Sequence, residues 1–176
     1  MNDFLAEACP RLAARLPKIG LADLPTPAET GSLRLGDNEY PIVIKRDDQT
    51  GKLYGGNKVR KLEYLLARAQ ARGAERIATF GTVGSNHALA TALYAHSLGY
   101  QCTCFLSHQA QTPTIARTLR LHLGLGTEIV HYGGGRANRI ATLRKHLWHR
   151  RVFLIPPGGS NWLGAVGIVA AGLELA

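Results

Sequence analysis

The sequence predicts an α/β fold in which a doubly wound parallel sheet packs between two layers of helices, a three-layer α/β/α arrangement. Beyond residue 57, short apolar segments alternate with helical patterns of about 10 to 15 residues. Two of the predicted strands end in glycine-rich loops that lead directly into a helix. This alternation favours a parallel sheet, because each parallel strand needs a long crossover connection to the next.

The N-terminal part of the chain is less regular. Residues 3–16 have helical spacing, and Pro25 and Pro27 then favour an extended connection. Residues 40–45 alternate in the manner of a strand, and the polar segment 46–48 predicts a turn after it.

The regular part of the chain begins at Asn57, a good N-cap residue for a helix that ends at Gly73. The elements after it are predicted as strand 77–80, helix 87–98, strand 102–106, helix 113–124, strand 128–132, helix 136–149, strand 152–156 and helix 161–175. The last helix is apolar and has no C-cap signal. We therefore expect the chain to stop inside a second domain whose body is missing.

Composition and charge narrow the class of protein. The chain has 176 residues, is 45% hydrophobic and carries a formal net charge of +9, yet its basic residues are scattered. The one dense basic run, 144–151, lies on a predicted helix without a nucleic-acid recognition motif, so we expect a solvated helix face and no nucleic-acid partner. No apolar run reaches the roughly 20 residues of a membrane span, and residues 1–4 do not begin a secretion signal. We expect a cytoplasmic protein without a membrane partner.

The three cysteines agree with a reducing compartment, because they form an odd count without disulfide-framework spacing. Cys102 and Cys104 stand two apart on a predicted buried strand. Core packing explains them better than a zinc site, and no metal is predicted.

Two loops are candidate ligand sites because each joins a strand to a helix. Residues 81–86 (Gly-Thr-Val-Gly-Ser-Asn) and residues 158–161 (Gly-Gly-Ser-Asn) would bring free backbone N–H groups to the carboxyl ends of strands, a setting suited to an anion. Ser85 and Asn86 add a hydroxyl and an amide. A Gly-Ser-Asn turn that only caps its helix is the alternative.

Lys58 stands in the first turn of a predicted helix, where the positive end of the helix dipole disfavours a cation. Lys61 lies three residues on and shares its face. Such a placement can lower the pKa of a lysine toward the neutral amine, the form that condenses with an aldehyde. A solvent-exposed lysine with no chemical task is the alternative.

Three ordered motifs carry a resemblance to a known family. They are residues 44–51 with 55–65 (Ile-Lys-Arg-Asp-Asp-Gln-Thr-Gly, then Gly-Gly-Asn-Lys-Val-Arg-Lys-Leu-Glu-Tyr-Leu), residues 84–87 (Gly-Ser-Asn-His) and residues 155–160 (Ile-Pro-Pro-Gly-Gly-Ser). Together they resemble the pyridoxal-phosphate-dependent 1-aminocyclopropane-1-carboxylate deaminases and D-cysteine desulfhydrases, which have the tryptophan-synthase β-like fold. The resemblance covers nearly the whole chain beyond about residue 22 and corresponds to the N-terminal half of such enzymes.

The resemblance implies roles for five residues. Lys58 would carry pyridoxal 5'-phosphate as a Schiff base and later move protons at the substrate. Ser85 would lie against the cofactor ring as a nucleophile or proton-relay residue, and Asn86 would hydrogen-bond the ring hydroxyl. Lys61 would reach the cofactor phosphate. His87 would orient the serine or contact the substrate, together with Ser85 and Asn86, although a histidine at a helix start is as often only structural.

The resemblance also implies the domain organisation and has two departures. Residues 1–54 would begin a large cofactor domain, residues 55–157 would form a small α/β domain, and residues 158–176 would return into the large domain, whose remainder is absent. Gly84 and Leu89 stand where the family often has glutamine and arginine, which leaves open a related but distinct branch.

The implied function is a lyase or deaminase that converts a small amino acid, of the D-cysteine or 1-aminocyclopropane-1-carboxylate type, to a 2-oxo acid and ammonia, with sulfide from D-cysteine. The alternative is a truncated remnant that binds the cofactor but is catalytically weak or inactive. The expected partner is the small amino-acid substrate, and a homo-oligomer remains compatible with the sequence.

Overall fold

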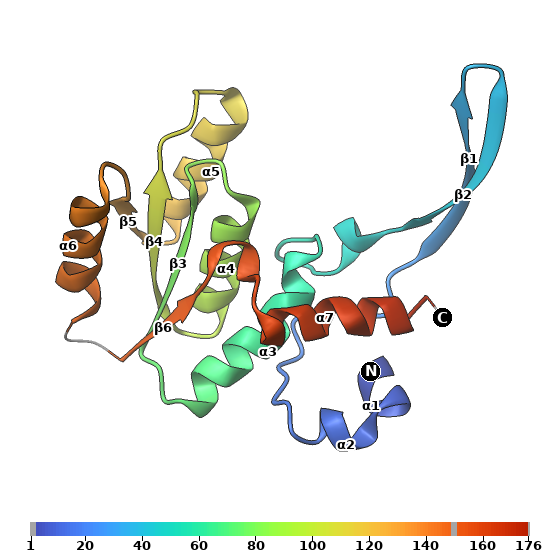
Figure 1. The fold of residues 1–176 in the computed structure, drawn as a ribbon, viewed down its shortest axis with the longest axis horizontal. Coiled ribbons are helices and arrows are strands. Elements are labelled where there is room, and N and C mark those ends of the chain that lie inside the picture. Colours follow the sequence, from blue (N-terminus) through green and yellow to red (C-terminus); the bar gives the residue numbers. More distant parts are fainter. Residues whose placement is uncertain (1–2, 149–150, 176) are drawn as a thin grey trace.

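A computed structural model describes residues 3–148 and 151–175 (Figure 1). It begins with two short helices, α1 (Phe4–Ala8) and α2 (Pro10–Ala13), so the single helix predicted over residues 3–16 is wrong. The break falls at Cys9, whose φ of −140° and ψ of 67° are not helical. Pro10 causes it, because a proline has no N–H for the helix ladder and its ring disfavours a helical residue before it.

An antiparallel hairpin follows, built from β1 (Ala28–Leu35) and β2 (Asn38–Lys45). β2 confirms the strand predicted over residues 40–45, whereas β1 was missed. The turn between them starts at Gly36, whose φ of 61° suits the first central position of a two-residue hairpin turn. Every residue of β1 is exposed, and the hairpin projects from the rest of the molecule (Figure 1).

The central sheet has four strands: β3 (Arg76–Thr82), β4 (Gln101–Ser107), β5 (Glu128–His131) and β6 (Val152–Ile155). All neighbouring pairs are parallel, and the spatial order is β5-β4-β3-β6, which confirms the predicted parallel sheet. The chain winds from β3 outward to β5 and then returns to place β6 on the other side of β3. The direction of winding therefore reverses between β3 and β6.

Helices cover both faces of the sheet, as the predicted three-layer arrangement requires. The helices beyond the hairpin are α3 (Lys58–Ala71), α4 (Asn86–Ser97), α5 (Pro113–Gly124), α6 (Arg136–Leu147) and α7 (Trp162–Leu173), of which α7 packs against α3. The 3₁₀ turns η1 (Asp47–Gln49) and η2 (Pro157–Gly159) join other elements. On one face, the Sγ atom of Cys104 lies 3.8 Å from the carbonyl oxygen of Ala88 in α4, with α3 and α5 beside α4. On the other face, Phe105 meets His146 of α6 edge to face.

Helix α7 crosses α3 at close range at Gly167, which has no side chain. A Cβ atom on Gly167 would lie 2.2 Å from the carbonyl oxygen of Arg60, so this crossing requires glycine. Arg60 itself is 1% exposed and donates to the carboxylates of Asp47 and Glu174. This network joins the base of the hairpin, α3 and α7, and it fixes the start of α3. The domain limits at 54/55 and 157/158 stay a prediction.

Candidate functional site

The two glycine-rich loops meet where the winding of the sheet reverses. One follows β3 and leads into α4, and the other follows β6 and forms η2. Because β3 and β6 are neighbours, both loops lie at adjacent carboxyl ends of parallel strands. A topological switch point of this kind is where open α/β sheets bind ligands. Of the five predicted residues, Ser85, Asn86 and His87 follow β3 at this edge, and Lys61 contacts the loop after β6.

Lys58 begins α3 directly after a tight turn. A Cβ atom on Gly55 would lie 1.7 Å from the carbonyl oxygen of Asp48, and Gly56 has a φ of 107°, so both positions of the turn require glycine. Asn57 occupies the N-cap position but makes no capping hydrogen bond, which corrects the prediction of a good cap. Its Oδ1 atom instead accepts a hydrogen bond from the Nζ atom of Lys58 at 2.8 Å.

The surroundings of Lys58 favour a neutral amine. Partial burial lowers the pKa of Lys58, and the positive charge of Lys61 lowers it further. A lysine must lose its proton before it can attack a carbonyl carbon, so both effects favour covalent chemistry at this position. The sequence had indicated the same direction from the helix dipole and from the spacing of the two lysines.

Lys61 reaches across to the second loop. Its Nζ atom donates to the carbonyl oxygen of Gly158 at 3.1 Å and lies 3.5 Å from the hydroxyl of Ser160. Gly159 between them has a φ of 62°, and a Cβ atom there would come within 3.4 Å of the Lys61 side chain and 3.5 Å of the His87 ring. The loop after β6 thus brings a cation and backbone groups together at the switch point.

Ser85 is the N-cap of α4. Its Oγ atom accepts a hydrogen bond from the backbone N–H of Ala88 at 3.2 Å, as the capping alternative predicts. The hydroxyl proton is not used in that bond and can still be donated. Gly81 makes room for this side chain, because a Cβ atom at Gly81 would lie 2.6 Å from the Cβ atom of Ser85.

Asn86 is exposed and held by a residue that the sequence did not reveal. The hydroxyl of Tyr54 donates to the Oδ1 atom of Asn86 at 2.9 Å, and the Tyr54 carbonyl accepts from the hydroxyl of Tyr94 at 2.8 Å. Burial raises the pKa of Tyr54, although Arg117 opposes the shift, so the hydroxyl remains a donor at neutral pH. No local pattern signals Tyr54, since its partner stands 32 residues away.

His87 points into the protein instead of toward the open edge. It is 4% exposed, and its Nε2 atom lies 2.9 Å from the hydroxyl of Thr79 on β3. Burial lowers the pKa of His87 to about 4, with further lowering from Lys58 and Lys61 and an opposing effect of the Pro156 carbonyl. Its Nδ1 atom is buried without a hydrogen-bond partner among the described residues. These contacts place the His87 ring in the core, and its contact with substrate stays a prediction.

Both departures from the resembled family have a local explanation. Gly84 donates its N–H to the Oε1 atom of Gln109 at 3.3 Å, and a Cβ atom at Gly84 would come within 3.0 Å of that oxygen. An amide from another segment therefore lies beside the position where the family often has glutamine. Leu89 is 3% exposed and faces the interior.

Other kinds of site find little support in the described part of the chain. Cys102 and Cys104 belong to the hydrophobic core, with their sulfur atoms 3.9 Å apart. Residues 3–148 and 151–175 contain no group of three metal-ligating side chains. In the same residues, no helix combines the length and apolar character needed to cross a bilayer.

Comparisons with known proteins identify the family of this chain. The family model described as "Pyridoxal-phosphate dependent enzyme" matches residues 20–176. The chain is 39% identical to a D-cysteine desulfhydrase of Serratia proteamaculans over 93% of its own length and 52% of the relative. It is 36% identical to a nocardicin C-9' epimerase of Nocardia uniformis over 92% of its length and 50% of that relative. The chain spans about half the length of the curated relatives it matches.

Solved structures give the same result for the fold. The structure of an ACC deaminase homologue superposes with a TM-score of 0.77 at 30% identity, over 99% of this chain and 53% of that one. An aspartate racemase dependent on pyridoxal 5'-phosphate has a TM-score of 0.59 at 18% identity, which shows a shared fold. From the match over residues 20–176 and the identity to these relatives, the chain belongs to the family of pyridoxal-phosphate-dependent enzymes.

Proposed function

We propose that this chain carries pyridoxal 5'-phosphate on Lys58 and serves a lyase or deaminase reaction on a small amino acid. D-cysteine and 1-aminocyclopropane-1-carboxylate are the substrate types. Hydrolytic deamination would release a 2-oxo acid and ammonia, with sulfide as a further product from D-cysteine. The observation that carries the proposal is the pair of lysines at the start of α3: Lys61 bonds the loop after β6 at the switch point, and together with burial it lowers the pKa of Lys58.

The residues at this edge fit the cofactor by their chemistry. An aldehyde condenses with a neutral amine, and burial and Lys61 lower the pKa of Lys58 in that direction. A phosphate needs cationic and N–H donors, and Lys61 supplies a cation beside the Gly158–Ser160 loop. A ring hydroxyl needs a neutral donor, and the Asn86 amide presents its nitrogen because Tyr54 occupies its oxygen.

The proposed roles of the individual residues follow from these contacts. Bound pyridoxal phosphate supplies an electron sink that weakens the bonds at the substrate Cα atom. Lys58 would hold the cofactor and move protons at the substrate, from Cα in the case of D-cysteine, and Ser85 would donate its free hydroxyl proton or relay one. Asn86 would orient the ring, and Lys61 would bind the phosphate. For His87 we propose packing support, since its buried ring bonds Thr79 and not the open edge.

One second function is favoured by a specific comparison. The nocardicin C-9' epimerase matches at 36% identity over 92% of the chain, and epimerisation shares the removal of a Cα proton with the deamination of D-cysteine. The two functions differ in outcome. An epimerase returns the proton to Cα and releases no ammonia, so exchange of the Cα proton with deuterated solvent without ammonia release would favour it.

The cofactor proposal is tested with the purified chain, pyridoxal phosphate and borohydride. We expect a visible absorbance band and, after reduction, a modified peptide that contains Lys58. Lys58→Ala should abolish both. Lys52→Ala is the matched control, because Lys52 is an exposed lysine of the preceding loop, and it should behave as the unaltered chain does. An adduct of equal yield in Lys58→Ala would contradict the proposal.

Substrate assays then separate an active enzyme from a cofactor-binding remnant. D-cysteine and 1-aminocyclopropane-1-carboxylate are supplied in parallel, and sulfide, ammonia and 2-oxo acid are measured. Release of product that depends on Lys58 supports the lyase or deaminase. An adduct on Lys58 without product from either amino acid would support the remnant for this chain.

A further inference from the structure

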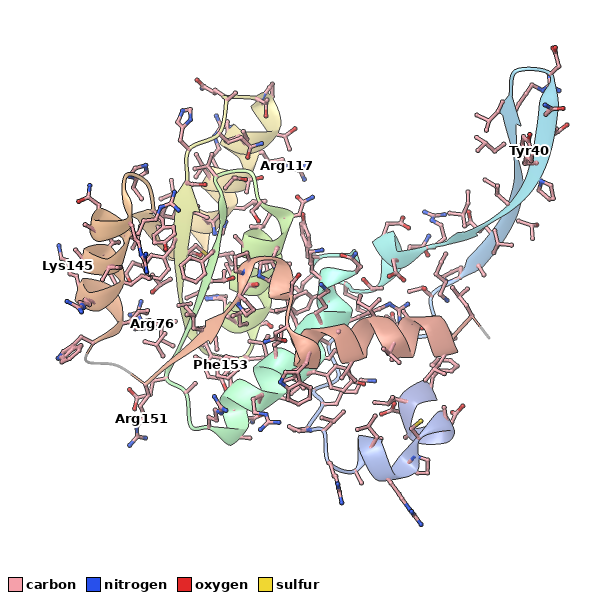
Figure 2. The ribbon with its side chains drawn as sticks, viewed as in Figure 1. Tyr40, Arg76, Arg117, Lys145, Arg151 and Phe153 are labelled. Carbon is pink, nitrogen blue, oxygen red and sulfur yellow. The ribbon has the colours of Figure 1, made fainter. Side chains whose placement is uncertain are left out.

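A second cavity lies away from the Lys58 site, between the C-terminal end of α3, strand β6 and the start of α7. Its volume is about 570 Å³, and its lining includes Arg68, Arg72, Arg151, Phe153, Asn161 and Trp162. Figure 2 shows Arg151 and Phe153 beside the lower end of α3. The lining of this cavity includes none of the proposed cofactor residues Lys58, Lys61, Ser85 and Asn86. The cavity is therefore separate from the proposed cofactor site.

Three guanidinium groups border this cavity, and two of them, those of Arg68 and Arg72, have no acidic partner among the described residues. The described residues that line it include no carboxylate. Within residues 3–148 and 151–175, neither Arg68 nor Arg72 forms an ion pair, and the Nε atom of Arg68 is buried without a hydrogen-bond partner. The guanidinium of Arg72 lies over the Phe153 ring, 5.8 Å from its centroid. The terminal guanidinium nitrogens of Arg68 and Arg72 are therefore not neutralised by an acid, and an anion in the cavity would supply the missing negative charge.

The third arginine comes from a different element. Arg151 precedes β6 and approaches the Glu75 carboxylate only to 3.8 Å, with both side chains mostly exposed. A pair of this kind contributes little and leaves the guanidinium able to bind another anion. The end of α3 by itself favours cations, which accounts for the placement of Arg68 and Arg72. It does not account for the convergence of Arg151 on the same cavity.

The start of α7 adds further donors. Asn161 is the N-cap of this 12-residue helix, and its Oδ1 atom accepts from Gly164 at 2.8 Å. Trp162 and Leu163 follow it in the first turn, where backbone N–H groups have no partner within the helix. Together with the positive end of the helix dipole, they favour an anion at this wall of the cavity.

We propose that this cavity binds a small molecule through a di- or triphosphate group. Arginines suit phosphate oxygens because a guanidinium donates two parallel hydrogen bonds. Trp162 is 66% exposed and lines the same cavity, so a planar ring attached to the phosphates can stack on it. Inorganic triphosphate and a nucleoside triphosphate share the recognised group.

Isothermal titration calorimetry of the 176-residue chain tests the proposal, with inorganic triphosphate as the probe. We expect binding that weakens as salt is added. Arg68→Gln with Arg72→Gln should weaken it by about tenfold or more, because charge-assisted hydrogen bonds are lost. The matched control is Arg11→Gln with Arg15→Gln, which removes the same charge from exposed positions near the N-terminus, and should change the affinity by less than about twofold.

Three outcomes would overturn the proposal. The first is no binding by the unaltered chain at about 1 mM triphosphate, and the second is an equal loss in both double variants, which would mean general charge attraction. The third is unchanged binding in the Arg68 and Arg72 variant, which would place the anion elsewhere, for example at Lys58 and Lys61. If that variant fails to fold by circular dichroism, Arg151→Gln takes its place, because that side chain is mostly exposed.

Adenosine triphosphate in a parallel titration distinguishes the two sources. Tighter binding than inorganic triphosphate, lost in Trp162→Leu, supports a nucleotide. Equal binding of both probes supports recognition of the phosphate group alone, and either result is consistent with the site.

Discussion

Arg60 of α3 and Glu174 at the end of α7 form an ion pair in which the Nη1 atom donates to Oε2 at 2.6 Å and both side chains are 1% exposed. Glu174 also accepts from the backbone N–H of Thr26 at 2.6 Å and from the Lys45 ammonium. One carboxylate thus joins α3, α7 and the base of the hairpin, with Lys58 two residues before Arg60.

Glu174→Ala should destabilise the protein strongly. Removing one partner of a buried ion pair leaves the other charge uncompensated, at a cost of about 3 to 5 kcal/mol. Urea unfolding followed by circular dichroism measures the change. Glu39→Ala is the control, because Glu39 pairs with Arg34 at 4.0 Å on the exposed hairpin and should cost less than about 1 kcal/mol. Equal effects of the two substitutions would show that the network contributes little.

The same carboxylate should make stability depend on acid pH. Burial alone would raise the pKa of Glu174, but hydrogen bonds from Arg60, Lys45 and Thr26 outweigh it and lower the pKa below 4.5. The folded state then binds the proton less readily than the unfolded state does, so this stabilisation is present above pH 4.5 and is lost as pH falls through the folded pKa. Glu174→Gln should remove this part of the pH dependence.

His87 should contribute in a higher pH window. Its pKa is about 4 in the folded protein against 6.5 for the free side chain, so the unfolded state gains the proton first. Stability from His87 is therefore full above pH 6.5 and falls by about 3 kcal/mol as pH drops to 4. Urea midpoints at pH 7, 5.5 and 4 measure this loss.

A matched variant isolates the His87 contribution. Burial also lowers the pKa of His122, so both histidines titrate in the same direction. His87→Gln should show a shallower fall between pH 7 and 4 than the unaltered chain, whereas His122→Gln retains the His87 contribution. Identical slopes in His87→Gln and the unaltered chain would rule out His87 as a source.

Tyr54→Phe should weaken cofactor binding without unfolding the protein. The substitution removes the hydrogen bond to Asn86 that leaves the amide nitrogen free for a ring hydroxyl. One such bond contributes about 0.5 to 1.5 kcal/mol, so we expect about a 2- to 10-fold weaker affinity for pyridoxal phosphate by absorbance titration. Tyr40→Phe, on the exposed hairpin, should leave the affinity unchanged. Unchanged affinity in Tyr54→Phe would argue against this positioning role.

Two glycines of α7 should respond in opposite ways to alanine. At Gly167 a Cβ atom would lie 2.2 Å from the Arg60 carbonyl oxygen, so Gly167→Ala should force α3 and α7 apart and cost about 1 to 3 kcal/mol. At Gly172 no atom lies within 4 Å, so Gly172→Ala should gain up to about 1 kcal/mol from helix propensity. Thermal unfolding of both variants measures the contrast, and a Gly167→Ala protein as stable as the original would contradict the close crossing.

The sequence by itself determined the parallel α/β sheet and most of its strands and helices. The signals were the local hydrophobic periodicity and the glycines at which segments end. It also pointed to Lys58, Lys61, Ser85 and Asn86, because these residues stand at helix starts and in strand-to-helix loops, which are local signals. It could not reveal β1, whose exposed strand lacks a buried face and hence a hydrophobic pattern, nor the break at Cys9 within a helical spacing.

Only the tertiary structure decided what each candidate residue contacts. The order β5-β4-β3-β6 placed two distant loops at one switch point, and contacts across 32 and 114 residues joined Tyr54 to Asn86 and Arg60 to Glu174. His87 turned inward to Thr79 although Asn86 before it is exposed. The physical reason is that local pattern sets the conformation of a segment, whereas burial, charge pairing and hydrogen bonds between segments depend on packing that no single segment contains.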